Sequence, residues 1–220
     1  YVPAGRSMPA AFNKRTGKFK RLLSGGGKVG GSWAMMDGNE LFAGNNNQGT
    51  DTKITFDART GSSRGDQFSR FPSIDLVLTK ETAYIATQRG IYAIDRAANS
   101  KANAAVPALD KESTALAKSI AAIRKRHKAA TGKPEKLKQI TAELAKATTR
   151  FTAIGREKTA VNGARVKWFT PRDGLGPMAL AGDTLFAGGE GFVISLDADT
   201  GKIVTDEKIK GTAVSLAVAD

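Results

Sequence analysis

Short apolar runs separated by polar turns dominate both ends of the chain, and they predict β-strands. The runs Val193–Leu196 and Ile91–Ile94 combine β-branched, aromatic and aliphatic residues. A short continuous apolar run bounded by turn residues is typical of a strand that is buried on both faces. Turn-forming residues precede such runs at 37–40 and 181–184. We therefore expect each region to fold as a meander of short antiparallel strands.

A strand followed by an Asp-x-x-Thr-Gly turn, or by a weakened form of it, occurs repeatedly along the chain. The turn segments are Asn13–Gly17, Asp57–Gly61, Asp95–Ala98 and Asp197–Gly201. An Asp or Asn side chain accepts backbone N–H bonds from residues two positions on, and Gly supplies the positive φ of a tight reversal. Recurrence of one strand-and-turn unit at this scale predicts a repeat architecture, because a single small sheet cannot bury both of its faces.

The spacing of the turns indicates the size of the repeat. Asn13 and Asp57 are 44 positions apart, and Asp57 and Asp95 are 38 apart. A four-stranded propeller blade has roughly 40–50 residues. The step from Asp95 to Asp197 is 102 positions, which leaves an excess for an insertion. The predicted fold class is mainly β: a partial β-propeller of four-stranded antiparallel blades with an inserted α-helical hairpin.

The expected domain organisation follows from these distances. Residues 1–99 are expected to form propeller blades, the first of them incomplete, and residues 100–164 an inserted basic helical hairpin. The propeller is expected to resume over 165–220 with a truncated last blade. Tyr1 falls in mid-strand, and the run 214–220 is similar to the start of a further unit. On this interpretation the chain is a fragment of a longer propeller.

The insertion has a helical rather than a strand pattern. Its apolar residues recur at steps of three and four, the spacing of one face of a helix that packs on a partner helix. Gly132-Lys133-Pro134 separates two such stretches and supplies a stop and a start signal. We expect helices at 110–131 and 134–155, with a seam formed by Leu116, Ile120, Ile123, His127, Leu137, Ile140, Leu144, Ala147, Phe151 and Ile154.

Most of the net charge of +13 lies in this insertion. Residues 101–170 contain sixteen Lys and Arg against five Asp and Glu, a balance of +11, and the remaining residues have a balance of +2. The candidate interaction residues are Arg124, Lys125, Arg126 and Lys128. An anionic surface or nucleic acid is one possible partner. A solvated, Lys-rich helix face is the favoured interpretation, because no aromatic residue is interleaved for base stacking.

A polar loop in the second repeat is another candidate. Asn46, Asn47 and Asp51 belong to the extra length before Asp57, and such a loop binds a ligand or Ca²⁺ through carbonyl and carboxylate oxygens. A longer hairpin loop is the favoured alternative, because the loop lacks the alternating carboxylates of a calcium site.

Other motifs are assigned to structure. The glycine-rich segment 24–32 lacks the Ser or Thr that a phosphate loop needs after Gly-Lys, and Gly188–Gly191 is expected to be a hairpin turn. His127 is the only histidine and there is no cysteine, so we expect His127 on the helical seam or surface. Trp33 and Trp168 are expected to pack between blades. We expect no catalytic, cofactor-binding or metal-binding residue.

The segments Asp57–Gly61 and Asp197–Lys202, each behind a buried strand, resemble the pyrroloquinoline-quinone-type β-propeller repeat. This quinoprotein-like repeat, WD40-like in architecture, occurs in quinoprotein dehydrogenases and in the lipoprotein scaffold of outer-membrane protein assembly. The resemblance covers about residues 1–98 and 165–220. The family usually has a Trp three or four residues after the Gly, where this chain has Phe19 or Lys20, Arg64 or Gly65, and Val204 or Thr205.

The resemblance implies a non-catalytic propeller scaffold for protein–protein or envelope interaction, with a protein partner and an exported or periplasmic location. The alternatives are a fragment of a quinone-dependent dehydrogenase, with pyrroloquinoline quinone and calcium, or the recognition domain of a larger enzyme. Active dehydrogenases of this kind often have a vicinal disulfide, and this chain has no Cys. We expect the scaffold, without a cofactor. No membrane span is expected, because no stretch approaches about 18 apolar residues.

Overall fold

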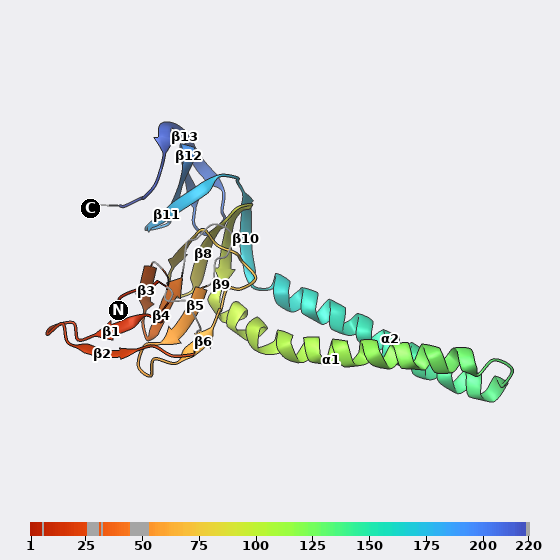
Figure 1. The fold of residues 1–220 in the computed structure, drawn as a ribbon. Coiled ribbons are helices and arrows are strands. Elements are labelled where there is room, and N and C mark those ends of the chain that lie inside the picture. Colours follow the sequence, from red (N-terminus) through yellow and green to blue (C-terminus); the bar gives the residue numbers. More distant parts are fainter. Residues whose placement is uncertain (6, 26–30, 32, 45–52, 219–220) are drawn as a thin grey trace. The chain divides into compact units, whose positions relative to one another are not determined.

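The computed structural model describes residues 1–220 except 6, 26–30, 32, 45–52 and 219–220. The described chain is a mixed α/β protein with several small antiparallel sheets and one long two-helix hairpin (Figure 1). It divides into two compact units. The sheet unit comprises residues 1–95 and 167–220, and the hairpin unit comprises residues 96–166.

Two sheets form from the first 65 residues of the sheet unit. The smaller pairs β1 (Ala10–Phe12) with β2 (Phe19–Leu22). The larger has four strands in sequence order: β3 (Trp33–Asp37), β4 (Glu40–Gly44), β5 (Lys53–Asp57) and β6 (Ser63–Gly65). Leu41 and Phe56 are fully buried in the core of this region, and Leu23, which follows β2, packs in the same cluster.

A second four-stranded sheet has the order β10-β9-β8-β7. Its strands are β7 (Asp75–Leu78), β8 (Thr82–Thr87), β9 (Gly90–Asp95) and β10 (Val166–Pro171). Every residue of β8 is buried, and Ile91 and Ile94 of β9 are fully buried, which confirms the predicted buried strand. β10 lies beside β9 although residues 96–165 separate them in sequence. The hairpin unit is therefore the connection between two neighbouring strands.

The fourth sheet shows that one predicted turn is wrong. It has three strands, β11 (Leu175–Ala181), β12 (Thr184–Asp197) and β13 (Ile203–Thr212). The expected hairpin turn at Gly188–Gly191 is absent, because β12 runs through it as one strand. The first part of β12 pairs with β11 and the second part with β13. Gly191 has a φ of +80° at a shift in register, so these glycines form a bulge instead of a reversal.

Three of the four predicted turns are confirmed, and the weakened copy at Asp95–Ala98 is wrong, because α1 begins at Arg96. The Asp57 carboxylate accepts the N–H groups of Arg59 and Thr60, both at 2.9 Å. The Asp197 carboxylate accepts the N–H and the hydroxyl of Thr200 at 2.8 and 2.7 Å. Asn13 forms the same kind of turn in the first copy. Gly61 and Gly201 have φ of +78° and +70°, which an L side chain rarely adopts, so Gly is required there.

Within the sheet unit, the same kind of contact joins neighbouring sheets twice. The carbonyl of Ala58, in the Asp57 turn, accepts the Tyr1 hydroxyl at 2.8 Å and the Arg21 guanidinium at 3.0 Å. The carbonyl of Ala198, in the Asp197 turn, accepts the Tyr84 hydroxyl and the Trp168 indole N–H. In both places two side chains from earlier in the chain donate to the carbonyl of the residue after the Asp. Arg21, Tyr84 and Trp168 belong to the preceding sheet, and Tyr1 precedes β1.

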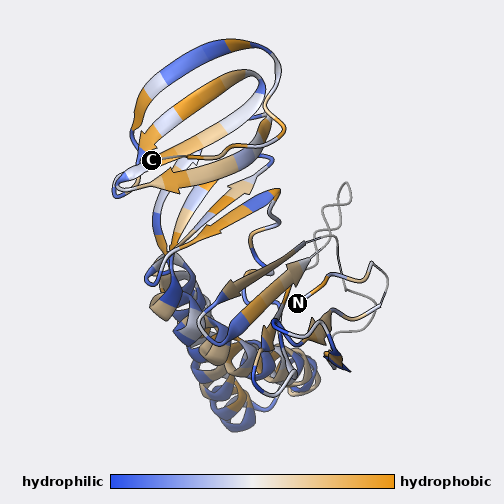
Figure 2. Ribbon diagram, turned by 90° about the vertical axis from the view of Figure 1, so that its left-hand side faces the viewer, coloured by the Kyte–Doolittle hydropathy of each residue, from blue (hydrophilic) through white to orange (hydrophobic). Residues whose placement is uncertain are grey.

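Apolar packing accompanies these hydrogen bonds. One core cluster combines residues of the β7–β10 sheet with residues of the β11–β13 sheet, including Ala86, Ile91, Leu185 and Ile194. Figure 2 shows hydrophobic residues concentrated along the strands. The expectation that small sheets bury one another's faces is therefore met between these two sheets.

The hairpin unit contains α1 (Arg96–Ala129) and α2 (Pro134–Gly163). The prediction of two helices with Pro134 opening the second is confirmed, but both predicted boundaries at the base were wrong. α1 begins directly after Asp95 instead of at 110, and α2 continues to Gly163 instead of ending at 155. Pro107 lies inside α1. The sequence between 96 and 110 is rich in Ala, a strong helix former, and packing of the helices extends the pair over it.

Arg165 stabilises the base of this unit. It is 1% exposed, and its guanidinium donates to the side-chain oxygens of Asn99, Asn103 and Asn162 at 3.1, 3.4 and 2.6 Å. Asn99 and Asn103 lie in the first turns of α1, and Asn162 lies in the last turn of α2. One buried cation thus ties the start of one helix to the end of the other.

Candidate interaction surface

The hairpin unit is the most strongly charged part of the chain. Residues 96–166 contain sixteen Lys and Arg against five Asp and Glu, a balance of +11. The other residues contain eighteen against sixteen, a balance of +2. Eleven positive charges within the hairpin have no acidic counterpart in it. Its surface is therefore the strongest candidate for an electrostatic interaction.

The packed seam between the helices gives this surface a defined shape. Ile123, Ala130 and Ile140 form its buried core, and Leu137, Leu144 and Ala147 pack against them. Ile120 and Ile154 are buried as well, so most of the predicted seam is confirmed. The prediction that Phe151 belongs to the seam is wrong, because its side chain is 39% exposed and it is not part of the packed cluster.

Ion pairs between the helices engage most of the acidic residues. Arg150 of α2 donates to both oxygens of Glu112 of α1 at 2.7 and 2.8 Å, and to Glu157 at 2.6 Å. The hydrogen bond from Arg150 lowers the pKa of Glu112, and the two carboxylates raise that of Arg150. Lys158 pairs with Asp110, and Arg126 pairs with Glu143. Three of these pairs, at Glu112, Asp110 and Glu143, join the two helices, and the pair of Arg150 with Glu157 lies within α2.

The end of the hairpin, residues 124–138, is the hairpin tip. It contains seven cations and one acidic residue, Glu135, and all seven cations are exposed. The structure brings together the four predicted residues Arg124, Lys125, Arg126 and Lys128 and three that the prediction missed. These are Lys133, Lys136 and Lys138.

The three missed lysines were identifiable from the same sequence. Gly132-Lys133-Pro134 was recognised as the connection between two antiparallel helices. An antiparallel connection places the first turn of α2 beside the last turn of α1. Cations within one turn of the connection on either side therefore belong to one surface.

His127 lies at the edge of this surface. It is half-buried, and its Nε2 atom is 3.2 Å from the Thr141 hydroxyl of α2. The prediction of a seam or surface histidine is confirmed.

The tip contains an open hollow of about 290 Å³. Ala129, Ala130 and Ile140 form its apolar part, and cations stand around it. Its lining residues are Arg126, Ala129, Ala130, Lys133, Lys136, Gln139, Ile140 and Glu143. An apolar floor with a cationic rim accommodates an acidic group that also has an aliphatic part.

The other predicted site residues are not brought into this surface. Asn46, Asn47 and Asp51 lie outside the described residues, as does most of the glycine-rich segment. The strand β3 follows that segment, whereas a phosphate loop leads into a helix. Trp168 packs between two sheets: its ring lies against Gly201, where an added Cβ atom would be 2.4 Å from the indole. That these sheets are blades stays a prediction.

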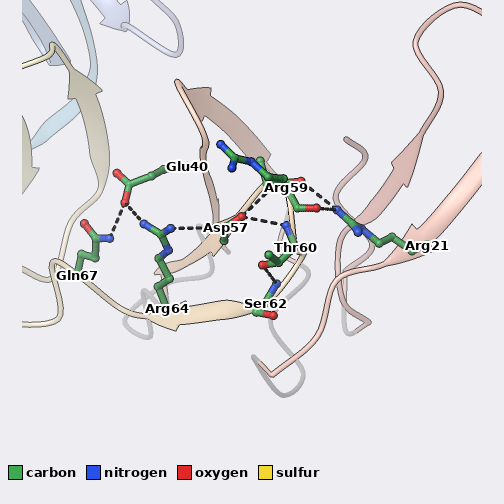
Figure 3. A network of polar contacts seen from close by, with 9 residues as sticks. Arg21, Glu40, Asp57, Arg59, Thr60, Ser62, Arg64 and Gln67 are labelled. Carbon is green, nitrogen blue, oxygen red and sulfur yellow. Dashed lines mark hydrogen bonds and ion pairs between the residues drawn. The ribbon is translucent and has the colours of Figure 1, made fainter.

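A polar network surrounds the Asp57 turn in the sheet unit (Figure 3). Arg64 donates to Asp57 at 2.5 Å and to Glu40 at 3.3 Å, and Gln67 donates to Glu40 at 3.0 Å. The backbone N–H of Thr60 and then the Arg64 guanidinium hold the pKa of Asp57 well below its usual range. Every group in this network has a structural partner, so we assign it to stability.

Searches of the chain found no matching family model and no matching curated protein. Within the described residues, no three or more His, Asp or Glu side chains are grouped so that they could hold a metal ion. Neither α1 nor α2 has an apolar stretch of the length and hydropathy needed to cross a lipid bilayer.

Proposed function

We propose that the chain is part of a non-catalytic β-propeller scaffold and that the hairpin unit is its protein-interaction element. In this proposal the small sheets are successive blades around a common axis. The repeated contacts at Ala58 and Ala198 support it, because in each the carbonyl after the Asp accepts two side-chain donors from earlier in the chain, at least one of them in the sheet before. Neighbour-to-neighbour contacts of one kind are what a repeat architecture requires.

The charge of the hairpin is the observation on which the functional part depends. A connection between two adjacent strands needs only a tight turn, yet here it is 70 residues long, residues 96–165, with a packed seam and a balance of +11 over residues 96–166. Long ordered connections in compact proteins are usually functional. An exported or periplasmic location remains part of the proposal and depends only on the resemblance of the repeats.

Site-specific photo-crosslinking in the source cells tests this proposal. A photoreactive residue replaces Ala129 at the hairpin tip, and in a second version it replaces Lys202, which is exposed in the Asp197 turn. We expect a discrete protein adduct from position 129 and none from position 202. Adducts from position 202 alone would contradict the assignment of the hairpin as the interaction element.

The dehydrogenase alternative has its own test. The purified chain is supplied with pyrroloquinoline quinone, Ca²⁺, an electron-accepting dye and a panel of alcohols and aldoses. We expect no dye reduction above that of the free quinone. Turnover that depends on the protein would reject the non-catalytic scaffold.

A further inference from the structure

We infer that the hairpin tip binds an extended acidic segment of a partner protein, rich in Asp and Glu. This inference rests on the proposed function and specifies the partner of the same surface. The observations are the arrangement of the cations, the chemistry of the hollow and an internal contact of the kind proposed.

The cations surround the tip instead of lining one face. Successive residues of an α-helix are about 100° apart, so Arg124, Lys125 and Arg126 span about 200° of the circumference of α1. Lys133, Lys136 and Lys138 add charge from α2. A nucleic-acid duplex or a flat membrane contacts one face of such a rod and leaves the cations on the other faces unused. A flexible polypeptide can follow the circumference and meet cations on several sides.

The residues between the cations favour close approach of a chain. Ala121, Ala122 and Ala129 are exposed on the same part of α1. Their small side chains leave the helix surface accessible between the long basic side chains. No large apolar residue of the tip is exposed in the described structure, so an interfacial membrane anchor is not present there.

The hollow distinguishes a carboxylate side chain from a phosphate. Arg126, Lys133 and Lys136 provide positive charge at its rim, and Ile140 and Ala130 provide an apolar floor. A Glu side chain has methylene groups for the floor and a carboxylate for the rim. A nucleic-acid phosphate has the charge without an aliphatic stem.

The structure already contains one such contact. Glu143 lines the hollow and its carboxylate is ion-paired with Arg126. This pair shows that a Glu carboxylate bonds one of the cations that line the hollow. Lys133 and Lys136 lie on the same rim and are the positions at which we expect a partner's carboxylates.

The test measures binding of three labelled probes to the full chain over a range of salt concentrations. The probes are a short peptide of alternating Glu and Asp, a DNA duplex of equal net charge and vesicles containing phosphatidylglycerol. A tip variant combines Arg124→Gln, Lys133→Gln and Lys136→Gln. The control variant Lys101→Gln, Lys111→Gln and Arg156→Gln removes the same number of Lys and Arg from exposed positions elsewhere on the hairpin.

We expect the acidic peptide to bind most tightly of the three probes. The tip variant should bind it about tenfold more weakly, the combined effect of three exposed ion pairs, and the control less than about twofold more weakly. Added salt should weaken binding of the unchanged chain more than that of the tip variant. Helical circular dichroism of both variants should equal that of the unchanged chain.

Three results would overturn the inference: no peptide binding at low salt, equal losses in the two variants, or tighter binding of DNA or vesicles than of the peptide. A photo-crosslinked partner at position 129 together with any of these would retain the proposed function and reject only the acidic segment. Peptide binding without any crosslinked partner would retain the tip as an acidic-peptide site and reject the scaffold role.

Discussion

Two kinds of connection join adjacent strands in this chain. One is the tight turn after Asp57 or Asp197, and the other is the long helical hairpin after Asp95. Each follows a buried strand and leads to the strand beside it. After Asp57 and Asp197 the chain reverses within a few residues, closed by the carboxylate, a Thr and a Gly. After Asp95 it enters α1 and returns only at Val166. β9 and β10 pair nonetheless.

The difference shows which interactions the strand pairing requires. Arg96-Ala97-Ala98 lacks the Thr and the Gly of the tight turn, and these residues are good helix formers. The pairing of β9 with β10 is instead accompanied by contacts of β10 itself. Trp168 donates to Ala198 at 3.0 Å and Thr170 donates to Gly201 at 2.5 Å. Contacts to the next sheet therefore replace the turn in positioning the last strand.

The largest effect is expected when the connection after Asp95 is replaced by the tight turn that follows Asp57. Residues 96–165 are replaced by Ala-Arg-Thr-Gly, the residues at 58–61. We expect the helical circular dichroism to disappear and the strand signal to persist, because β9 and β10 already lie side by side. The same replacement with Ala-Ala-Ala-Ala is the control and should be less stable, since it lacks the capping Thr and the Gly. Loss of the strand signal in both would show that the sheet unit depends on the hairpin.

The next largest effect is expected at Trp168. Trp168→Ala removes the ring that lies against Gly201 and the donor to Ala198, so it should destabilise the sheet unit by about 3 kcal/mol. Trp168→Phe keeps much of the ring and loses the N–H, so it should cost about 1 kcal/mol. Urea unfolding followed by circular dichroism measures both. Equal losses of unfolding free energy in the two variants would mean that Trp168 stabilises the sheet unit through its hydrogen bond alone.

The sequence predicted the elements whose signals are local. The turns at Asp57 and Asp197, the buried strand at 91–94 and the seam residues Ile123 and Ile140 all occur where their patterns placed them. Each depends on residues within a few positions of one another. The chemistry of a capping carboxylate or of an apolar helix face is visible at that range.

The errors concern signals that depend on distant partners. Gly188–Gly191 has the composition of a turn, but β11 and β13 pair with opposite ends of β12 and keep it extended. For Trp168 the sequence named no partner, because Ala198 and Gly201 lie 30 or more positions further on, in the turn of the next sheet. In the candidate site, the four tip cations of α1 were predicted. The cations near the start of α2 were missed, because they join the same surface only when the chain returns antiparallel to α1.

A smaller effect is expected from the charge of Asp57, the carboxylate that closes one of the tight turns. Its pKa is lowered in the folded chain, so its ionised form stabilises the fold at pH values above the unfolded pKa of about 3.9. Asp57→Asn should lower the melting temperature at pH 7. The difference from the unchanged chain should shrink as the pH falls below about 4 toward the folded pKa.

The control for this prediction is Asp199→Asn, an exposed position of the Asp197 turn that is not the capping residue. It should change the melting temperature less than Asp57→Asn at pH 7. A constant difference between Asp57→Asn and the unchanged chain from pH 7 to pH 3 would contradict an ionic contribution. The turn would then depend on hydrogen-bond geometry, which Asn retains in part.

The smallest effect on stability is expected in the hairpin, where ion pairs between side chains, instead of a tight turn, connect two segments. Arg150→Gln removes the contacts to Glu112 and Glu157, all of them partly exposed. Exposed ion pairs contribute little and are screened by salt, so the helical melting temperature should fall slightly at low salt and match the unchanged chain at high salt. Arg156→Gln, on an exposed face of α2, is the matched control and should have no such salt-dependent effect. A large loss that persists at high salt would mean that Arg150 stabilises the seam by packing of its aliphatic stem.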